Sequence, residues 1–596
     1  RPGTYLYICG PDGDMALAVN DMAIYDRMTP DFLRQRLDFI NGADLVVLET
    51  NLPEESIRWL CDNCKAPILA DPVSTIKAEK LRPVLGKLAA LNPNRLEAEL
   101  LSSMSIRTRE DAAQAARKLL DTGLGTVFIS LGAEGIYAAD RSGDTAWVPC
   151  ARCTVANATG GGDAVAAALA VFVLINLFYF APQFSGQTLL QGDVQQYKGS
   201  SEDIMQHREK YGEDPQWEGN MFGGMPAYLI NVQYEGTVIK TLSKAFYFLG
   251  QPAALIFIAM TAFFFMLLCM RFNPWIGIVP SLAYGFSTYF FIIIGAGHVT
   301  KMMALAFAPM LFGGVWYAFR RNMWVGAALT GVFASIEIGV NHPQITYYFL
   351  FILAAFWINE LVSAARAKAL PRFAKTTGLL ALAAVLAVGS NAGMLYYINS
   401  HSAETMRGGS ELREARTGEK QQGLDIEYAT AWSYGPGETF NLLIPNLYGG
   451  SSEGGFSEDG AVADALGKYN ARQVAAHLPG YWGPQPGTSG PVYVGAAALL
   501  LAVLGLFVLR GRSKWWVAAV ALLAVLLSWG NHFMGLTELF FRHFPMYNKF
   551  RTVSMILVIV EWCVPFLAAV VLQRIWCGRI EHARLMKGLK YSVLTV

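Results

Sequence analysis

Charged side chains are scarce in this chain, and their scarcity excludes several classes of protein. Only 16% of the 596 residues are Asp, Glu, Lys or Arg, whereas 53% are hydrophobic. A chain this long and this apolar is not a single soluble domain. Neither sign of charge prevails, because 47 Lys and Arg stand against 46 Asp and Glu, for a net charge of +1. The composition therefore gives no reason to expect a nucleic-acid partner.

A flexible linker is also lacking where the composition changes. Residues 1–163 carry charges at the density of an ordinary globular domain, and the remainder alternates long apolar runs with polar loops. The two parts meet in AVAAALAVFVLINLFYFA (164–181), an uncharged run that spans roughly 27 Å as a helix. Fused modules are normally joined by segments rich in Gly, Ser or Pro. We therefore expect a composite chain, joined within residues 164–175 by gene rearrangement or during sequence assembly.

Cysteine is sparse too, and its spacing argues against a zinc site. Cys61 and Cys64 form one CxxC pair, and Cys150 and Cys153 form another. Zinc ribbons place their two pairs much closer than the roughly 85 residues seen here. Reduced thiols in a cytoplasmic first domain are the better interpretation. The chain begins at Arg1 without a cleavable signal sequence, so we expect a fragment or a processed piece.

The first part, residues 1–168, alternates short β-rich runs with amphipathic helical segments. The expected strands are TYLYICG (4–10), DLVVLET (44–50), APILADP (66–72), LAALNPN (88–94) and TVFISLG (126–132). The expected helices cover residues 30–42, 54–64 and 109–123. This alternation predicts an α/β domain with a largely parallel sheet, in which ligands bind at the carboxyl ends of the strands.

Three polar motifs follow in an informative order: NPNRLE (92–97), SLGAEG (130–135) and NATGGGD (157–163). Glycines before a helix can turn backbone N–H groups toward a phosphoryl group, which the helix dipole also favours. Together the motifs resemble the PfkB-type carbohydrate and nucleoside kinases of the ribokinase-like fold. The segments AVNDMAIY (18–25) and ILADPVSTIKAEKL (68–81) look most like the pseudouridine kinases among them.

The resemblance implies a role for each motif, with ATP and Mg²⁺ as the ligands. Asp163 would be the catalytic base. The other implied residues are Gly160, Gly161, Gly162, Ser130 and Gly132 for the nucleotide and its phosphates, and Asn94 and Glu97 for the metal. A glycine triplet can also be a plain tight turn, and an Asn…Glu pair can be a helix cap. Segments that such kinases carry on either side of these motifs are missing, so we expect residues 1–170 to phosphorylate nothing by themselves.

The second part, residues 169–596, predicts a polytopic all-α membrane domain. Ten runs of about spanning length lie near 164–181, 246–269, 275–296, 302–319, 323–340, 344–362, 376–398, 490–509, 515–529 and 552–573. Positive charges fall on alternate connections, at Arg271, Arg320 and Arg321, 366–375, 510–514 and after Arg574. Since such charges stay on the cytoplasmic side, the first domain is expected in the cytoplasm, and loops 182–245 and 399–489 outside.

Polar and aromatic motifs gather in those outer loops and at the ends of the spans. They include DPQWEGNMFGGMPAY (214–228), GHVTKMM (297–303), NHPQITYY (341–348) and PMYNKFRTVSM (545–555). Residues from about 170 onward resemble the bacterial YfhO-type membrane proteins, which look like the GT-C class of glycosyltransferases. The resemblance implies a bacterial inner-membrane enzyme that takes sugar from a polyprenyl-phosphate carrier at the outer face of the bilayer.

By that resemblance, Asp193 matches the acidic residue of the first outer loop. It would act as base on an acceptor hydroxyl or hold a divalent cation near the donor phosphate. Glu404 and Glu438 are weaker candidates for a second carboxylate. Five cationic or titratable residues near the expected outer face are candidates for the donor phosphate: His298, Lys301, Arg407, Lys549 and Arg551.

Two alternatives remain open. The five cationic candidates could instead contact lipid headgroups or pair with loop carboxylates, and His342 could simply be a hydrogen-bonded residue of a short turn. A non-catalytic transporter or assembly factor is the other alternative to an enzyme. Glu337, Glu360 and Glu561 are the ionisable residues in the expected spans that could line a transport pathway.

Overall fold

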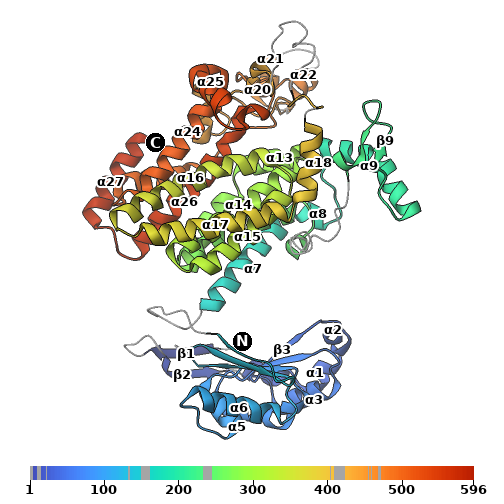
Figure 1. Cartoon of the computed structure of the whole chain (residues 1–596), viewed down its shortest axis with the longest axis vertical. Coiled ribbons are helices and arrows are strands. Elements are labelled where there is room, and N and C mark those ends of the chain that lie inside the picture. Colours follow the sequence, from blue (N-terminus) through green and yellow to red (C-terminus); the bar gives the residue numbers. More distant parts are fainter. Residues whose placement is uncertain are drawn as a thin grey trace. The chain divides into compact units, whose positions relative to one another are not determined.

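The computed structural model describes residues 4–9, 15–21, 23–131, 134–148, 161–231, 245–402, 404–408, 423–453, 455–457, 460–466 and 471–596. The chain divides into two compact units, residues 1–161 (unit 1) and 162–596 (unit 2), which are described separately (Figure 1). Gly132, Gly160 and the side chain of Asp163 lie outside the described part.

Unit 1 is built on a six-stranded sheet in the order β3-β4-β5-β6-β7-β8. Strands β3 (Val46–Glu49), β4 (Ile68–Asp71), β5 (Ala90–Leu91) and β6 (Thr126–Ser130) are parallel, as the alternation of strands and helices predicts. Strands β7 (Ile136–Asp140) and β8 (Thr145–Val148) continue the sheet antiparallel and were not expected. Strand β1 (Thr4–Cys9) pairs with β2 (Met15–Asp21) in a separate sheet.

Helices of unit 1 connect its parallel strands. The helices α3 (Glu54–Asn63), α5 (Arg95–Ser102) and α6 (Arg109–Leu120) follow β3, β5 and α5 in the chain. Their apolar faces meet the sheet in one core, where Ile57, Ala98 and Ala115 have no exposed surface. The expected helix over 30–42 is two short helices, α1 (Pro30–Arg34) and α2 (Leu37–Asn41).

Helix α7 (Gly161–Tyr179) joins the glycine-rich motif to the apolar run in one continuous helix. Its first residues are glycines of that motif, so Asp163 stands in the first turn as predicted. Further along, Ala168 and Phe172 are fully buried in the core of unit 2. The Phe172 ring meets that of Phe264 edge to face, with centroids 5.6 Å apart. The helix therefore packs as part of the helical unit.

Unit 2 is helical and is held by one large apolar core. Its principal helices are α11 (Ala253–Cys269), α12 (Pro274–Gly285), α13 (Thr288–Ala296), α14 (Val299–Arg320), α15 (Met323–Gly339), α16 (Pro343–Arg366), α17 (Leu370–Gly389), α18 (Ala392–Ser402), α23 (Ala496–Val508), α24 (Ser513–Ser528), α25 (Met534–His543) and α26 (Val558–Trp576). Helices α14, α15 and α17 lie side by side (Figure 1). A buried aromatic contact joins α14 to α26, with the Phe312 and Trp562 rings 4.7 Å apart.

Several helices of unit 2 have the length and apolarity of membrane spans. Among the described residues four pass by themselves, α14, α16, α17 and Val553–Trp576, and the number rises to six if each of two bent pairs is one span. Four shorter apolar helices lie near the other expected spans. Each expected span thus coincides with an apolar helix, although α17 ends at Gly389 and α18 begins a new direction at Ala392. These helices are compatible with a membrane protein, and ten spans stays a prediction.

The cationic turns and the polar motifs occupy opposite ends of the long helices. His298 precedes α14 and Arg320 ends it, and His342 precedes α16 and Arg366 ends it. Arg320 Nη2 lies 2.6 Å from Glu360 Oε1 near the end of α16, so the two cationic ends are neighbours. Since α14 has 22 residues, its two ends are separated by roughly 33 Å.

Candidate functional site

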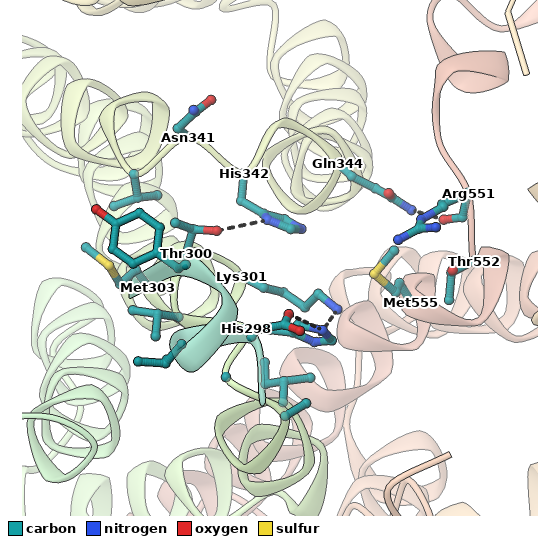
Figure 2. Close-up of a pocket in the computed structure, with 18 of the residues that line it drawn as sticks. His298, Thr300, Lys301, Met303, Asn341, His342, Gln344, Arg551, Thr552 and Met555 are labelled. Carbon is teal, nitrogen blue, oxygen red and sulfur yellow. Dashed lines mark hydrogen bonds and ion pairs between the residues drawn. The ribbon is translucent and has the colours of Figure 1, made fainter. Parts of the chain in front are cut away.

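A cavity of about 1350 Å³ opens among helices of unit 2 at the end of α14 and α16 that carries the polar motifs. Its walls come from the first turn of α9 (Gly192–Tyr211), the turn between α13 and α14, the start of α16, and the segment before α26. Figure 2 shows side chains from these separate segments pointing toward one another. A cavity of this size accommodates a substrate-sized ligand.

The cavity brings together residues that the sequence analysis selected individually. The lining contains Asp193, His298, Lys301, Arg407 and Arg551. Lys549 is not part of the lining; its Nζ donates to the Arg407 carbonyl over 2.6 Å, and Arg407 Nε donates to the Lys549 carbonyl over 3.1 Å. Lys549 therefore holds the segment of Arg407 in place. The role of these residues toward a phosphate stays a prediction.

Three of the lining residues form a hydrogen-bonded chain from α9 to α14. Lys301 Nζ lies 3.1 Å from His298 Nδ1, and His298 Nε2 lies 3.1 Å from Asp193 Oδ2 (Figure 2 labels the lysine and the histidine). Close packing supports the chain, because a Cβ on Gly297 would come within 3.1 Å of both Asp193 Cβ and Val194 N. Gly297 adopts φ +91°, which only glycine does at low cost.

The charge state of His298 follows from this chain. Burial lowers the pKa of His298, and the neighbouring Lys301 ammonium lowers it further, while Asp193 opposes the shift. A neutral imidazole accepts from Lys301 at Nδ1 and donates Nε2–H to the Asp193 carboxylate, which satisfies all three groups. The geometry therefore assigns this tautomer, in which Asp193 orients His298 and His298 orients the Lys301 ammonium. Lys301 itself is only 8% exposed.

Arg551 is held on the opposite wall of the cavity. Its Nη1 donates to the Tyr428 hydroxyl over 2.6 Å. Its carbonyl accepts from Gln344 Nε2 over 2.6 Å (Figure 2). Thr552, the next residue, has φ +59°. A β-branched residue in this left-handed region is strained, and such strain concentrates at functional sites. The fold thus accepts a backbone cost to set the direction of Arg551.

Two helices present their N-termini to the same cavity. Val299, Thr300 and Lys301 are the first residues of α14, and His342 and Gln344 flank the first residue of α16, Pro343. N–H groups at a helix start have no partner within the helix, and the helix dipole makes this end positive. Together with Lys301, Arg407 and Arg551, the two termini make this end of the cavity electropositive. Asp193 is the one carboxylate among the lining residues that the structure describes.

His342 is a lining residue that the sequence analysis left as a turn residue. Its Nδ1 lies 3.4 Å from Thr300 Oγ1, whereas its Nε2 is buried without a hydrogen-bond partner (Figure 2). The position in NHPQ gave a signal, because a histidine directly before a helix-starting proline sits at a helix N-terminus. Sequence alone offered no way to know that this N-terminus would face that of α14.

The two weaker carboxylate candidates lie outside the cavity lining. Glu438 is 1% exposed and accepts from the Tyr481 hydroxyl over 2.8 Å, from Gln485 Nε2 over 2.9 Å and from the Gly435 N–H over 3.0 Å. Its carboxylate therefore organises the loop that places Gln485 in the wall of the cavity. Glu404 is exposed in a turn beyond α18.

In unit 1 two of the predicted kinase motifs are adjacent. Asn94, which lies beyond the end of β5, forms a parallel bridge with Ser130, the last residue of β6, as expected for strand ends in a parallel sheet. Asn94 Oδ1 accepts from the Glu97 N–H over 3.0 Å, and Glu97 Oε2 accepts from the Asn94 N–H over 2.9 Å. This is a capping box for α5. Burial raises the pKa of Glu97. The cap accounts for both side chains, and their role toward a metal stays a prediction.

Metal ligands do not gather elsewhere in the part of the chain that the structure describes. Within it, no group of three or more His, Cys, Asp or Glu side chains could hold a metal ion. Cys61 is buried in α3, and burial raises the pKa of its thiol to about 11. A thiol of this kind is unreactive at neutral pH. Cys150 and Cys153 lie outside the described residues.

Comparison with known proteins finds relatives of the first part of the chain. Residues 1–176 match the family model for pfkB family carbohydrate kinases. The pseudouridine kinase of Escherichia coli is 39% identical over 168 residues, 28% of this chain and 54% of that protein. The ribokinase of Staphylococcus aureus is 28% identical over 137 residues, 23% of this chain and 45% of that protein. A ribokinase structure from Thermotoga maritima is 19% identical, with a TM-score of 0.24 over 29% of this chain and 56% of that one.

These findings assign a fold class and a family to the first part of the chain. Unit 1 is an α/β domain in which two of the predicted motifs meet at strand ends. The N-terminal segment is a PfkB carbohydrate-kinase domain, similar to pseudouridine kinase. The chain spans about half the length of the curated relatives it matches. The resemblance of residues 169–596 to YfhO-type proteins stays a prediction.

Proposed function

We propose that unit 2 is a membrane glycosyltransferase-like enzyme that takes sugar from a polyprenyl-phosphate carrier at the outer face of the membrane. The observation that carries this proposal is the convergence of Lys301, Arg407 and Arg551 with Asp193 on one cavity. Phosphate is the ligand that such a set of cationic donors and helix N-termini favours. The same cavity is lined by apolar residues, among them Ile292, Met303, Val340 and Met394, which suit a lipid chain.

The transfer uses both the carboxylate and the cationic residues of the cavity. In the transfer the bond from the anomeric carbon to the phosphate oxygen breaks, and a bond from that carbon to the acceptor oxygen forms. Asp193 takes the proton of the acceptor hydroxyl, and the bonding electrons leave with the phosphate, whose charge grows from about −1 to about −2. Lys301, Arg407 and Arg551 favour the more highly charged leaving group over the ground state, which is how they accelerate the step.

The proposed face of the membrane follows from the charges on the helix ends. Cationic turns such as Arg320 and Arg366 lie at the end of the bundle opposite the cavity. Positive residues in short connections are retained in the cytoplasm. We therefore propose that the cavity lies at the outer leaflet, where a flipped lipid-linked sugar is accessible, and that residues 1–161 lie in the cytoplasm.

The test uses the full chain in proteoliposomes with a panel of radiolabelled polyprenyl-phosphate hexoses and bacterial membrane extract as acceptor. We expect label to move from the carrier to a new product. Asp193→Asn should lower the rate by about 100-fold or more, because general-base catalysis contributes on that scale. Glu202→Gln is the matched control, since Glu202 lies on α9 but pairs with Gln206 outside the cavity. Undiminished transfer by Asp193→Asn would contradict the proposal.

A second candidate function belongs to unit 1, and the identity to pseudouridine kinase favours it. It is phosphorylation of a ribose-type hydroxyl by ATP, with Mg²⁺ near Asn94 and Glu97, and with Asp163 as the base. The full chain incubated with ATP, Mg²⁺ and pseudouridine tests it through formation of the phosphorylated nucleoside. Product that is lost in Asp163→Asn would support this function. Product formed by purified residues 1–170 would contradict the expectation that they phosphorylate nothing by themselves.

A further inference from the structure

His342 has a ring nitrogen that no residue in the described part of the chain satisfies. The ring lies in the wall, with Nδ1 directed at Thr300 and Nε2 buried without a partner (Figure 2). Burying a hydrogen-bonding atom without a partner is unfavourable, and native proteins seldom do so without a reason. A ligand that bonds to Nε2 would remove this cost when it enters the cavity.

The backbone around His342 is built to hold the ring in this place. His342 is the residue before α16, and the following Pro343 fixes the start of the helix. Asn341 precedes it with φ +57°, a left-handed conformation that asparagine tolerates better than most residues. The Thr300 hydroxyl, from the first turn of α14, then holds one ring nitrogen. The starts of α14 and α16 together therefore fix the orientation of the ring and of its Nε2.

The charge state of the ring decides what Nε2 can do. Burial lowers the pKa of His342 to about 3, and the charges of Lys301, His298 and Arg407 contribute to the same shift. The imidazole is therefore neutral at physiological pH and carries one N–H. When the Thr300 hydroxyl donates to Nδ1, the hydrogen resides on Nε2, and the ring presents a neutral donor to the cavity.

We propose that His342 binds a non-bridging phosphate oxygen of the cavity's ligand by donating Nε2–H, with the Thr300 hydroxyl donating to Nδ1. The inference rests on the proposed function, because it assumes that the ligand bears a phosphate group. An anion is the fitting partner since Lys301 and Arg551 line the same cavity, and a cationic ligand would be repelled by them. His342 is thus a binding residue that adds a directional donor to the surrounding point charges.

The test measures binding to the full chain in detergent micelles with two probes, farnesyl phosphate and farnesol. Farnesol has the same apolar chain and lacks the phosphate. His342→Phe keeps a flat ring without the donor, so we expect affinity for farnesyl phosphate to fall about tenfold, the usual effect of losing one hydrogen bond to a charged group. Affinity for farnesol should stay the same. His477→Phe, at an exposed position on α22 (Ala471–His477), is the matched control.

Two further variants separate a specific contact from a general disturbance. His342→Gln places an amide N–H near the position of Nε2 and should restore most of the affinity for farnesyl phosphate. Thr300→Val leaves the ring intact but removes the hydroxyl that selects the tautomer, and it should weaken binding by a smaller factor. A loss in His342→Phe that Gln does not restore would overturn the role of His342 as a donor.

The same binding measurements distinguish a failure of the role of His342 from a failure of the proposed function. If Arg551→Ala weakens binding of farnesyl phosphate while His342→Phe leaves it unchanged, the phosphate cavity stands and the role of His342 is wrong. If the unaltered chain binds farnesol as tightly as farnesyl phosphate, the cavity does not recognise phosphate. In that case both the inference and the proposed function are overturned.

Discussion

Among the residues with positive φ that line the cavity of unit 2 are Gly297, Asn341 and Thr552, with φ of +91°, +57° and +59°. Each directly precedes or follows a residue with a function in our proposals, namely His298, His342 and Arg551. Side chains are rarely placed this way unless the surrounding fold enforces it. At the scale of single residues, therefore, the strained backbone conformations lie at the same cavity as the charged side chains.

The half-buried histidines of this site, His298 and His342, make stability depend on pH. The pKa of His342 in the folded chain is about 3, whereas that of an unfolded histidine is about 6.5. Between these values the unfolded chain binds more protons than the folded one, so the free energy of unfolding falls as pH falls. The pKa of His298 is lowered as well and adds to the same trend.

We accordingly expect the melting temperature of the full chain in micelles to decrease from pH 7 to pH 5, a range in which ordinary carboxylates stay mostly ionised. His342→Phe should reduce that decrease, since it removes the group that is protonated on unfolding. His477→Phe should leave it unchanged. An equal pH dependence in the unaltered chain and in His342→Phe would show that His342 titrates normally.

At the scale of elements, the ends of α14 and α16 are joined by an ion pair far from the cavity. Glu360 is 6% exposed and accepts from Arg320 Nη2 over 2.6 Å and from Asn359 Nδ2 over 3.0 Å. This arrangement favours a structural role for Glu360 over a place in a transport pathway. Glu337 and Glu561 differ, because each keeps one buried oxygen without a partner, and a transporter stays the alternative that they support.

We expect Glu360→Ala to destabilise unit 2 by about 1–3 kcal/mol, because it leaves a partly buried guanidinium unpaired. Thermal or denaturant unfolding in micelles measures the effect, and adding Arg320→Ala should recover part of it. Sugar transfer by the folded fraction should be unaffected. Loss of ion uptake by proteoliposomes without loss of stability would instead assign Glu360 to a transport pathway.

At the scale of the whole molecule, the direction of the helical unit in the membrane can be tested with two positions. Cys577 is exposed directly after α26, at the cationic end, and Glu453 is exposed in the second large polar loop. In intact cells a membrane-impermeant maleimide should label the Glu453→Cys variant at that position and leave Cys577 unlabelled. Permeabilised cells should show both. Labelling of Cys577 in intact cells would reverse the proposed orientation.

Much of the architecture was accessible from patterns along the chain. Alternation of β-rich and amphipathic segments predicted the parallel strands β3 to β6, and apolar runs predicted the helices of unit 2. Local spacing was less informative about β7 and β8, which are only five and four residues long, and about the break between α1 and α2. In these places neighbouring elements outweigh local propensity.

The sequence by itself determined three features. They are the kinase-like motifs of the first part, the long apolar helices of the second part, and the cationic residues near the ends of those helices. Tertiary structure alone decided that Asp193, His298, Lys301, Arg407 and Arg551 share one cavity while Lys549 and Glu438 support it from outside. It also placed His342 opposite Thr300. The physical reason is that residues separated by hundreds of positions meet only through helix packing, which local spacing does not encode.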